Sequence, residues 1–383
     1  MPGKNLPEIA NEPCRRCKEN SAALVVRTEP LCRDCFVKYV HTKAIKRLES
    51  FRVRNAAPDH HRKILLALSS GVSSAALLHI LDHHLKTQKT KTGRTGFALS
   101  VVFVGAPDVN FQAEELLAKA RDHYPDHEYA SLPLYDIFCL VSDDASLLAL
   151  IRPLGAAPDL PPAEKLAQLI NSLTSATARA DVISTIRTRL IVEHAKSIGC
   201  EGILWGDSTT KLAEKTLAET AKGRGFSLPW QVADGESPFG ITFHYPLRDV
   251  LKKELVSYVK LAEPSLASIV HASSVPTQAS MSSKNTTIDD LMKQYFESVE
   301  ENFPSIVSNV VRTTSKLEAA SVSASDPYCD LCNMPVPAGR FGIHGWGGDQ
   351  KDGVDGCNKE GLDLCYGCTR SIPQLAIDTN GNP

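Results

Sequence analysis

Paired cysteines are the residues of this sequence with the clearest capacity for chemistry. Eleven cysteines stand in 383 residues, and eight of them form four Cys-x-x-Cys pairs. The first two pairs are separated by fourteen residues and consist of Cys14, Cys17, Cys32 and Cys35. Four thiolates complete the tetrahedral shell of a structural zinc ion, so we predict zinc at this set. An iron–sulfur cluster is the alternative, because four-cysteine sets hold both groups.

Two further cysteine pairs lie near the C-terminus: Cys329 with Cys332, and Cys365 with Cys368. They are separated by 32 residues, in which positions 340–356 are rich in glycine. We predict a second four-thiolate zinc site here, with His344 and Cys357 as alternative ligands. A closed shell leaves no position for a substrate, so both sites are expected to stabilise local folding rather than perform chemistry.

The context of the cysteines favours metal binding over disulfides. The first thirteen residues contain no apolar signal core, and no apolar run reaches the roughly 20 residues that cross a bilayer. A cytosolic protein is therefore expected, and cytosolic cysteines stay reduced. Two unpaired cysteines with apolar neighbours, Cys139 and Cys200, are predicted to be buried core thiols.

A serine-rich turn follows a short apolar segment. Residues 64–68 are continuously hydrophobic, which is typical of a central parallel strand, and an apolar helix is expected after the turn. The turn consists of Ser69, Ser70, Gly71, Val72, Ser73 and Ser74. Backbone N–H groups at such a turn, together with the dipole of the following helix, can hold an anion. An ordinary strand-to-helix turn is the alternative.

Positive charge is concentrated at the N-terminus. Residues 1–63 carry 14 Lys and Arg against 7 Asp and Glu, whereas the whole chain has a formal net charge of −2. This excess on a short module indicates an anionic partner, for which nucleic acid is the usual candidate. The predicted phosphate ligands lie in the cysteine knuckles and on the following helix: Arg15, Arg16, Arg33, Lys43, Lys46 and Arg47. A solvated basic surface without a partner is the alternative.

Apolar strands alternate with amphipathic helices through the middle of the chain. The expected strands are 64–68, 97–104, 127–132 and 202–206, and the expected helices between them include 110–124, 173–198 and 207–222. This alternation predicts an α/β fold with a doubly wound parallel sheet, in which ligands bind beyond the carboxyl ends of the strands. The serine-rich turn and residues 205–211 would both lie at that edge.

The rest of the chain is expected to supply smaller elements. These are a hairpin within 22–30, a helix over 36–53, a surface loop over 86–96, mostly helix over 136–151, a helix over 248–260, and helices over 288–299 and 304–317. The predicted domains are a zinc-ribbon module with a basic helix at 1–55, the α/β domain at 60–270, a helical appendage with a Ser/Thr-rich insert at 271–320, and a cysteine-paired tail at 321–383.

The serine-rich turn resembles the Ser-Gly-Gly-x-Asp-Ser pyrophosphate loop of ATP-dependent tRNA-modifying and amide-forming enzymes. Two of the five specified positions differ, since Ser70 replaces a glycine and Ser73 replaces the aspartate. The first change adds a side chain where the backbone should lie close to phosphate or take a positive φ. The second removes a carboxylate from the nucleotide site. The shape of the loop can therefore survive without its chemistry.

The zinc ribbon, the degenerate loop and the cysteine-paired C-terminus together resemble the cytosolic tRNA 2-thiolation proteins over nearly the whole chain. The resemblance implies an α/β domain of the adenine nucleotide alpha hydrolase-like type. This family has two paralogous subunits, and the catalytic one keeps the intact loop, a mid-chain Cys-x-x-Cys pair and a later cysteine. Here residues 174–179 and 269–273, where those cysteines would fall, contain none, and one acid, Asp207, remains in the following acidic turn.

The resemblance therefore implies a non-catalytic subunit that is not an enzyme on its own. It implies a heterodimer with the catalytic paralogue, tRNA binding, and 2-thiolation of the wobble uridine to form 5-methoxycarbonylmethyl-2-thiouridine. Sulfur would come from a thiocarboxylated ubiquitin-related modifier, and ATP and an iron–sulfur cluster would belong to the partner. Two alternatives stay open: a self-sufficient ATP-dependent tRNA sulfurtransferase, and a zinc-ribbon adaptor that binds only proteins.

Overall fold

A six-stranded sheet forms the centre of the protein. The computed structural model describes residues 12–55, 62–105, 110–140, 160–271, 286–319, 326–336 and 363–372. The strands run in the spatial order β5-β4-β3-β6-β8-β7. Their bounds are β3 Lys63–Leu68, β4 Ala98–Gly105, β5 Glu128–Pro133, β6 Gly202–Trp205, β7 Gly235–Glu236 and β8 Thr242–His244. All neighbouring pairs are parallel except β7 with β8 at one edge. The predicted parallel α/β sheet is confirmed, with one antiparallel edge strand.

The central strand β3 is buried on both faces. Leu65 and Ala67 point into the hydrophobic core on one side of the sheet. Ile64, Leu66 and Leu68 point into a second core on the other side. Side chains alternate between the two faces of a strand, so a strand covered on both sides must be apolar at every position. This explains why residues 64–68 show no polar alternation.

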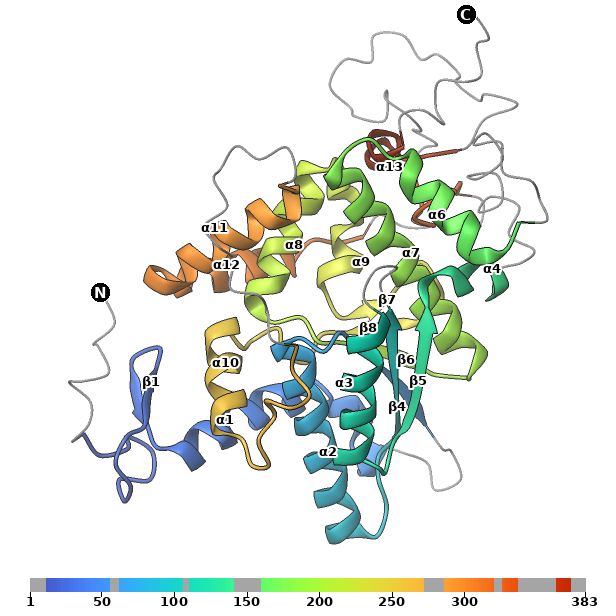
Figure 1. Cartoon of the computed structure of the whole chain (residues 1–383). Helices are drawn as coiled ribbons and strands as arrows, with labels where there is room; N and C mark the ends of the chain where they lie inside the picture. The colour runs from blue at the N-terminus through green and yellow to red at the C-terminus, as the bar shows by residue number, and fades with distance from the viewer. Residues whose placement is uncertain are drawn as a thin grey trace, which may run out of the picture.

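Helices cover both faces of the sheet, which makes it doubly wound (Figure 1). One face carries α1 Arg33–Lys46, α2 Val72–Thr92, α3 Asn110–His123 and α10 Lys252–Leu261. The other carries α4 Ile137–Leu140, α6 Pro162–Ser172, α7 Ala176–Ser197, α8 Thr209–Ala221, α9 Leu228–Val232, α11 Ile288–Asn302, α12 Pro304–Thr314 and α13 Tyr366–Ser371. Within the described residues, no helix combines the length and apolarity that a membrane span requires.

Two expected elements differ from the structure. The basic segment expected as a surface loop over 86–96 is mostly helix, because α2 continues to Thr92 and ends at Gly93 with φ +74°. The helix expected over 36–53 begins earlier and ends at Lys46, where it gives way to the short 3₁₀ turns η2 Glu49–Phe51 and η3 Val53–Asn55. Of the helix expected over 136–151, the described part is the turn η4 Leu134–Asp136 followed by α4. The Ser/Thr-rich insert lies almost wholly outside the described residues.

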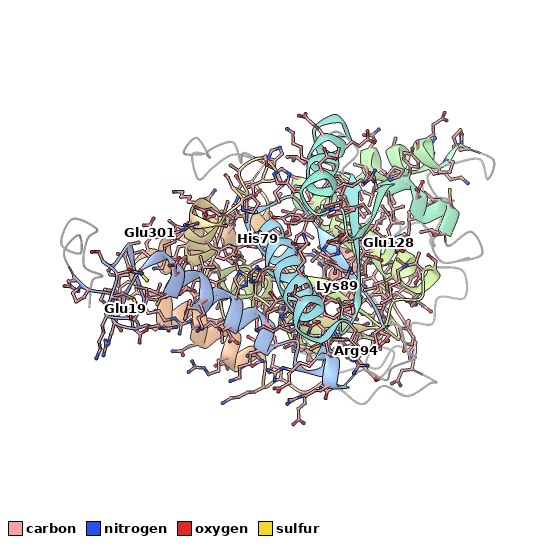
Figure 2. All side chains as sticks on the ribbon, turned by 90° about the horizontal axis from the view of Figure 1, so that it is seen from below. Glu19, His79, Lys89, Arg94, Glu128 and Glu301 are labelled. Carbon is pink, nitrogen blue, oxygen red and sulfur yellow. The ribbon has the colours of Figure 1, made fainter. Side chains whose placement is uncertain are left out.

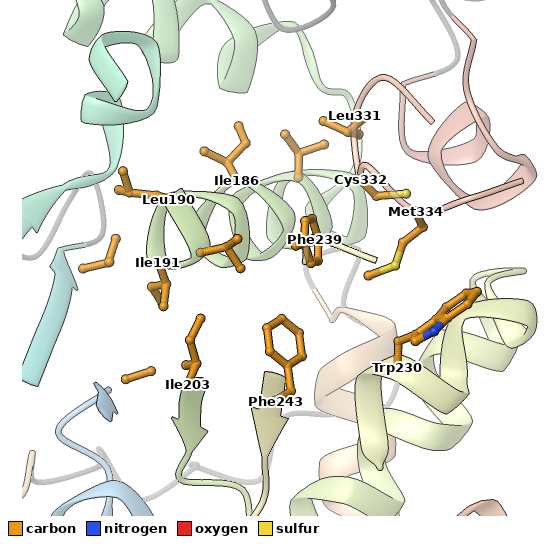
Figure 3. Close-up of a cluster of buried hydrophobic side chains, with 14 of the residues drawn as sticks. Ile186, Leu190, Ile191, Ile203, Trp230, Phe239, Phe243, Leu331, Cys332 and Met334 are labelled. Atoms are coloured by element: carbon orange, nitrogen blue, oxygen red, sulfur yellow. The ribbon is translucent and has the colours of Figure 1, made fainter. Parts of the chain in front are cut away.

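The two cysteine modules pack onto opposite faces of the sheet. The predicted hairpin is present as β1 Leu24–Val26 and β2 Glu29–Leu31, which pair antiparallel, and its module joins the core that contains α1 and α2. The C-terminal cysteines join the core that contains α7. Figure 3 shows Leu331, Cys332 and Met334 beside Phe239 and the α7 residue Ile186. The modules are therefore parts of the core rather than separate appendages.

Candidate metal centres and the degenerate nucleotide loop

The first cysteine set converges to a single point. The sulfur atoms of Cys14, Cys17, Cys32 and Cys35 all lie within 4.8 Å of one another. The first knuckle closes through a hydrogen bond from the Lys18 N–H to the Cys14 carbonyl across 2.8 Å, with Lys18 at φ +62°. The second pair brackets the start of α1, because Cys32 is its N-cap and Cys35 lies in its first turn. The predicted grouping of these thiols is confirmed.

The second cysteine set also converges. The sulfur atoms of Cys329, Cys332, Cys365 and Cys368 lie within 4.8 Å of one another, and all four residues are buried. The Arg189 guanidinium holds the first knuckle by donating to the carbonyls of Asp330 and Leu331, across 3.0 and 3.1 Å. The expected alternative ligands His344 and Cys357 lie outside the described residues.

Sulfur spacing decides which group these sets fit. Around one tetrahedral ion with metal–sulfur bonds of about 2.3 Å, neighbouring sulfurs stand about 3.8 Å apart. The Cys17 and Cys32 sulfurs are 3.8 Å apart, and the Cys332 and Cys365 sulfurs are 3.9 Å apart. In a four-iron cluster each thiolate binds a different iron, so the sulfurs must spread further. Both sets therefore fit a single tetrahedral ion.

Each cysteine set contains one thiol that ionises readily. Burial alone would raise the pKa of Cys14, but hydrogen bonds from the backbone at Cys32, Cys17 and Arg16 lower that pKa to about 6. Burial and the neighbouring thiols raise the pKa of Cys35 to about 12. In the second set the pKa of Cys329 is lowered, because hydrogen bonds from the other three thiols outweigh burial. A bound cation would favour ionisation of the remaining thiols.

A buried ion network packs against α13, the helix that bears Cys368 of the second set. The Arg224 guanidinium contacts both oxygens of Asp181 and donates to Glu219 across 2.7 Å. The Ser371 hydroxyl, at the end of α13, donates to Asp181 across 2.5 Å. Gly367 lies against Arg224, since a Cβ there would stand 2.5 Å from the Arg224 Cγ. The helix that bears Cys368 therefore rests directly on this network.

The serine-rich turn joins β3 to α2 in an unusual conformation. Ser70 takes φ +54°, the left-handed region that favours glycine, and is 2% exposed. Its carbonyl accepts a hydrogen bond from the His271 N–H across 2.8 Å. Its hydroxyl has no hydrogen-bond partner among the described residues. The position where the resembling loop has glycine therefore keeps a backbone shape typical of glycine while carrying a side chain.

The polar groups of the turn bond to one another. The Ser74 Oγ accepts from the Ser69 N–H across 3.2 Å and donates to the Gly71 carbonyl across 3.2 Å. The Ser69 and Ser74 hydroxyls are 3.0 Å apart. An amide that could point at an anion is therefore already occupied. Gly71 is the N-cap of α2 and has no side chain to cap the helix, so it satisfies none of the N–H groups in the first turn.

The turn after β6 lies against the serine-rich turn, as expected for two carboxyl-end loops. A Cβ on Gly206 would stand 2.8 Å from the Ser74 Cα, so only glycine allows this approach. Asp207 follows directly, and the Ser208 hydroxyl caps α8 by accepting from the Lys211 N–H across 3.2 Å. The two turns therefore lie together at the carboxyl edge of the sheet, where α/β proteins bind ligands, and Asp207 is the carboxylate in the second turn.

Four of the six candidate phosphate ligands make ion pairs or hydrogen bonds within the chain. Arg16 pairs with Glu29, Arg33 pairs with Glu263, Lys43 donates to the Asp249 carbonyl, and Arg47 pairs with the Asp249 carboxylate. Three of these contacts attach α1 to residues around α10. Arg15 and Lys46 are exposed and make no ion pair with a described residue. The sequence could not reveal this difference, because the partners lie up to about 230 positions away.

Comparison with known proteins identifies the family. A family model described as cytoplasmic tRNA 2-thiolation protein 2 matches residues 287–340. A protein of that name from Pyrenophora tritici-repentis is 64% identical over 384 residues and is covered in full, as is this chain. One from Phaeosphaeria nodorum is 67% identical over 377 residues, with 98% of each chain covered. The chain belongs to the cytoplasmic tRNA 2-thiolation protein 2 family. The resemblance noted in the sequence is confirmed.

The fold of this family member is also found in a solved tRNA-modifying protein. The chain superposes on the U34-tRNA thiolase NcsA from Methanococcus maripaludis, solved with its [4Fe-4S] cluster, with a TM-score of 0.58. The match covers 85% of this chain and 93% of that one, at 16% sequence identity. Similarity at that level shows a shared fold and confirms the expected adenine nucleotide alpha hydrolase-like type.

One prediction about the unpaired cysteines of this family member was wrong. Cys139 is exposed rather than buried. It lies on the one-turn helix α4, whose buried side chains are Ile137 and Phe138, so the next two residues point outward. Cys200 is buried as expected, and burial raises the pKa of its thiol to about 11.

Sequence reasoning missed a histidine-lined cavity at the joint between the N-terminal module and the α/β core. The cavity has a volume of about 410 Å³ and is lined by His41, His79 and His83, among others. The His41 Nε2 lies 2.6 Å from the Tyr258 hydroxyl, and the His79 Nδ1 lies 2.9 Å from the Tyr124 hydroxyl. The spacing of His79 and His83 on one helical face was the only available signal, since His41 comes from another helix.

Proposed function

We propose that this chain is the non-catalytic subunit of a cytoplasmic complex that 2-thiolates the wobble uridine of tRNA. It would form a heterodimer with the catalytic paralogue, which would supply the ATP site and an iron–sulfur cluster. The product would be 5-methoxycarbonylmethyl-2-thiouridine, with sulfur from a thiocarboxylated ubiquitin-related modifier. Family membership and the shared fold with a U34-tRNA thiolase support this proposal.

The hydrogen bonds inside the serine-rich turn are the observation that supports a non-catalytic role for this chain. Thiolation must first turn the uridine oxygen into a leaving group, which requires that a loop hold the phosphates of ATP during adenylation. Here the Ser69 amide bonds to Ser74, and Ser73 stands where the resembling loop has a carboxylate. A nucleotide would have to displace the hydrogen bonds of the turn and would find no acid at this position.

The cysteines support the same conclusion for sulfur transfer. Transfer needs an accessible thiolate, persulfide or cluster-bound sulfide. Eight cysteines lie in two closed sets whose spacing fits one tetrahedral ion each, and we propose zinc for both. Cys200 is buried with a raised pKa, which disfavours its thiolate. Among the described residues Cys139 is the exposed thiol outside the two sets, so a test must exclude it.

The N-terminal module would contribute to tRNA binding through its basic side chains. Arg15 and Lys46 are the strongest candidates, because they are exposed and have no described ion-pair partner. Exposed pairs such as Arg16 with Glu29 are worth about 0–1 kcal/mol, so a phosphate can replace the carboxylate. The partly buried hydrogen bond from Lys43 to the Asp249 carbonyl would be retained to position α1.

Reconstitution with separately purified subunits tests the proposal. We expect no thiolated uridine from this chain alone with ATP, tRNA and a sulfur donor, and product once the catalytic paralogue is added. The Cys139→Ser variant should support the same yield. Product from the isolated chain would establish the self-sufficient enzyme instead. Full activity of the paralogue without this chain, or loss of activity in Cys139→Ser, would also overturn the proposal.

A further inference from the structure

A second basic surface lies at the end of α2, within the segment expected as a loop. Residues 86–94 contain four basic residues and no acidic one. Lys86 pairs with Asp82 and Asp126. Lys89, Lys91 and Arg94 are exposed and make no ion pair with a described residue. These three charges therefore face solvent without a counterion from the described part of the chain.

The end of α2 is held firmly in place. The Gly93 N–H donates to the Lys89 carbonyl across 2.9 Å, and the Gly96 N–H donates to the Gln88 side chain across 2.9 Å. The Thr92 hydroxyl donates to the Gln88 carbonyl across 2.9 Å. The basic residues are thus presented on a capped helix end and a short bonded turn. Binding would cost little ordering of the backbone there.

A second segment adds charge beside this turn. A Cβ on Gly96 would stand 2.0 Å from the Phe51 carbonyl oxygen, so residues 51–53 lie directly against it. Arg52 and Arg54 share a single carboxylate oxygen of Glu49, at 3.2 and 2.9 Å. Burial and the nearby Arg52 lower the pKa of His84 on α2, which agrees with this proximity. We call the five residues Arg52, Arg54, Lys89, Lys91 and Arg94 the basic platform.

We propose that the basic platform binds the phosphate backbone of tRNA, a role that rests on the proposed function. Arg52 and Arg54 share one carboxylate, Glu49, and the other three residues make no ion pair with a described residue, which gives a local excess of positive charge. Lys and Arg on a rigid surface neutralise phosphates without reading base sequence. The platform is not suited to a lipid surface, because the exposed large hydrophobic residues among those described are Leu140, Leu217, Leu291, Tyr295, Phe303, Ile306 and Leu317, none of them on α2 or its neighbouring turns.

The platform is separate from the cysteine knuckle. In Figure 2, Glu19 of the N-terminal module lies at the left edge of the molecule, whereas Lys89 lies near the centre and Arg94 below it. Helix α1, about 21 Å long, connects that module to the turns η2 and η3, where Arg52 and Arg54 of the platform lie. A structured RNA could therefore contact both surfaces at once, and each would add to affinity.

Charge reversal tests the platform in the full-length chain. The variant Lys89→Glu/Lys91→Glu/Arg94→Glu should weaken tRNA binding at least tenfold in low salt, for all tRNAs alike. It should also reduce the slope of log affinity against log salt by about 2–3. The matched control Lys260→Glu/Arg312→Glu/Lys316→Glu makes the same charge change at sites away from the platform and should change affinity much less. Equal melting temperatures of the variants would show that folding is retained.

The outcomes are distinguishable. Unchanged affinity and salt slope in the platform variant, with tRNA binding intact, would overturn the platform alone. An equal loss in the control would show a net-charge effect and would also overturn it. If the platform variant still binds tRNA but no longer binds the paralogue, the surface would be assigned to an acidic protein partner instead. If the wild-type chain binds no tRNA, alone or with the paralogue, the proposed function fails as well.

Discussion

The Ser74 hydroxyl closes the nucleotide-type loop by accepting a hydrogen bond from the Ser69 N–H across 3.2 Å. The donor is a backbone amide at the carboxyl end of β3, where a related loop would offer it to phosphate. The same hydroxyl donates to the Gly71 carbonyl, so Ser74 links both sides of the turn. These hydrogen bonds tie the end of β3 to the start of α2.

The first prediction concerns strain in this joint. Replacing Ser70→Gly should raise the free energy of unfolding by about 1 kcal/mol, because glycine accepts φ +54° and the unpartnered hydroxyl is removed. The greater freedom of glycine in the unfolded chain offsets part of that gain. Urea unfolding should show a higher midpoint with an unchanged slope. As a control, Ser70→Ala removes the hydroxyl but keeps the strain, and it should gain less. A lower midpoint for Ser70→Gly would contradict this account.

The second prediction concerns the metal ions. Wild-type protein should contain two zinc ions per chain, and either Cys14→Ser or Cys332→Ser should contain one, by elemental analysis. Both variants should also lose stability, because Cys14 and Cys332 each belong to a hydrophobic core on one face of the sheet. Cys139→Ser is the matched control and should keep both ions. Loss of both ions from one single variant would show that the two sets are not independent.

The third prediction concerns the ion network under the second cysteine set. Arg224→Met should lower stability by about 3–5 kcal/mol, because the buried carboxylates of Asp181 and Glu219 then share Lys222 as their one buried cation among the described residues, which leaves one negative charge uncompensated. The double variant Arg224→Met/Asp181→Asn should recover part of this loss, since one uncompensated charge is removed. A double-mutant cycle measured by denaturant unfolding tests the coupling. Additive effects would mean that Arg224 and Asp181 do not stabilise each other.

The fourth prediction concerns acid stability. Burial, with His83, His79 and His84 nearby, lowers the pKa of His41 from 6.5 to about 4. Between these values the unfolded chain binds a proton at this position and the folded chain does not, so stability should fall as pH drops from 6.5 toward 4. The loss from this group is at most about 3 kcal/mol. Burial lowers the pKa of His79 as well, which acts in the same direction.

The His41→Gln variant tests this pH dependence. Its unfolding free energy should vary less between pH 6.5 and 4.5 than that of the wild-type chain. His127 directly precedes β5 and does not line the cavity that contains His41. The variant His127→Gln therefore serves as the control. Parallel pH profiles for His41→Gln and wild type would assign the acid sensitivity to other groups.

Local pattern in the sequence was sufficient for the four predicted parallel strands and for the grouping of the cysteines. Continuous apolar runs bounded by turn residues give central parallel strands, and Cys-x-x-Cys spacing brings two thiols to one knuckle whatever surrounds it. The replacement of glycine by Ser70 and of aspartate by Ser73 was likewise visible in the sequence, and with it the expectation of a loop without its chemistry.

Tertiary structure decided the features that depend on residues far apart in the chain. It showed which arginines are already paired, that Ser74 occupies the loop amide, and that Cys139 faces outward. It also placed Arg52 and Arg54 beside the end of α2, where the sequence had suggested only a loop. Such contacts follow from the packing of helices on a common sheet, and no local pattern encodes which distant side chain arrives at a given surface.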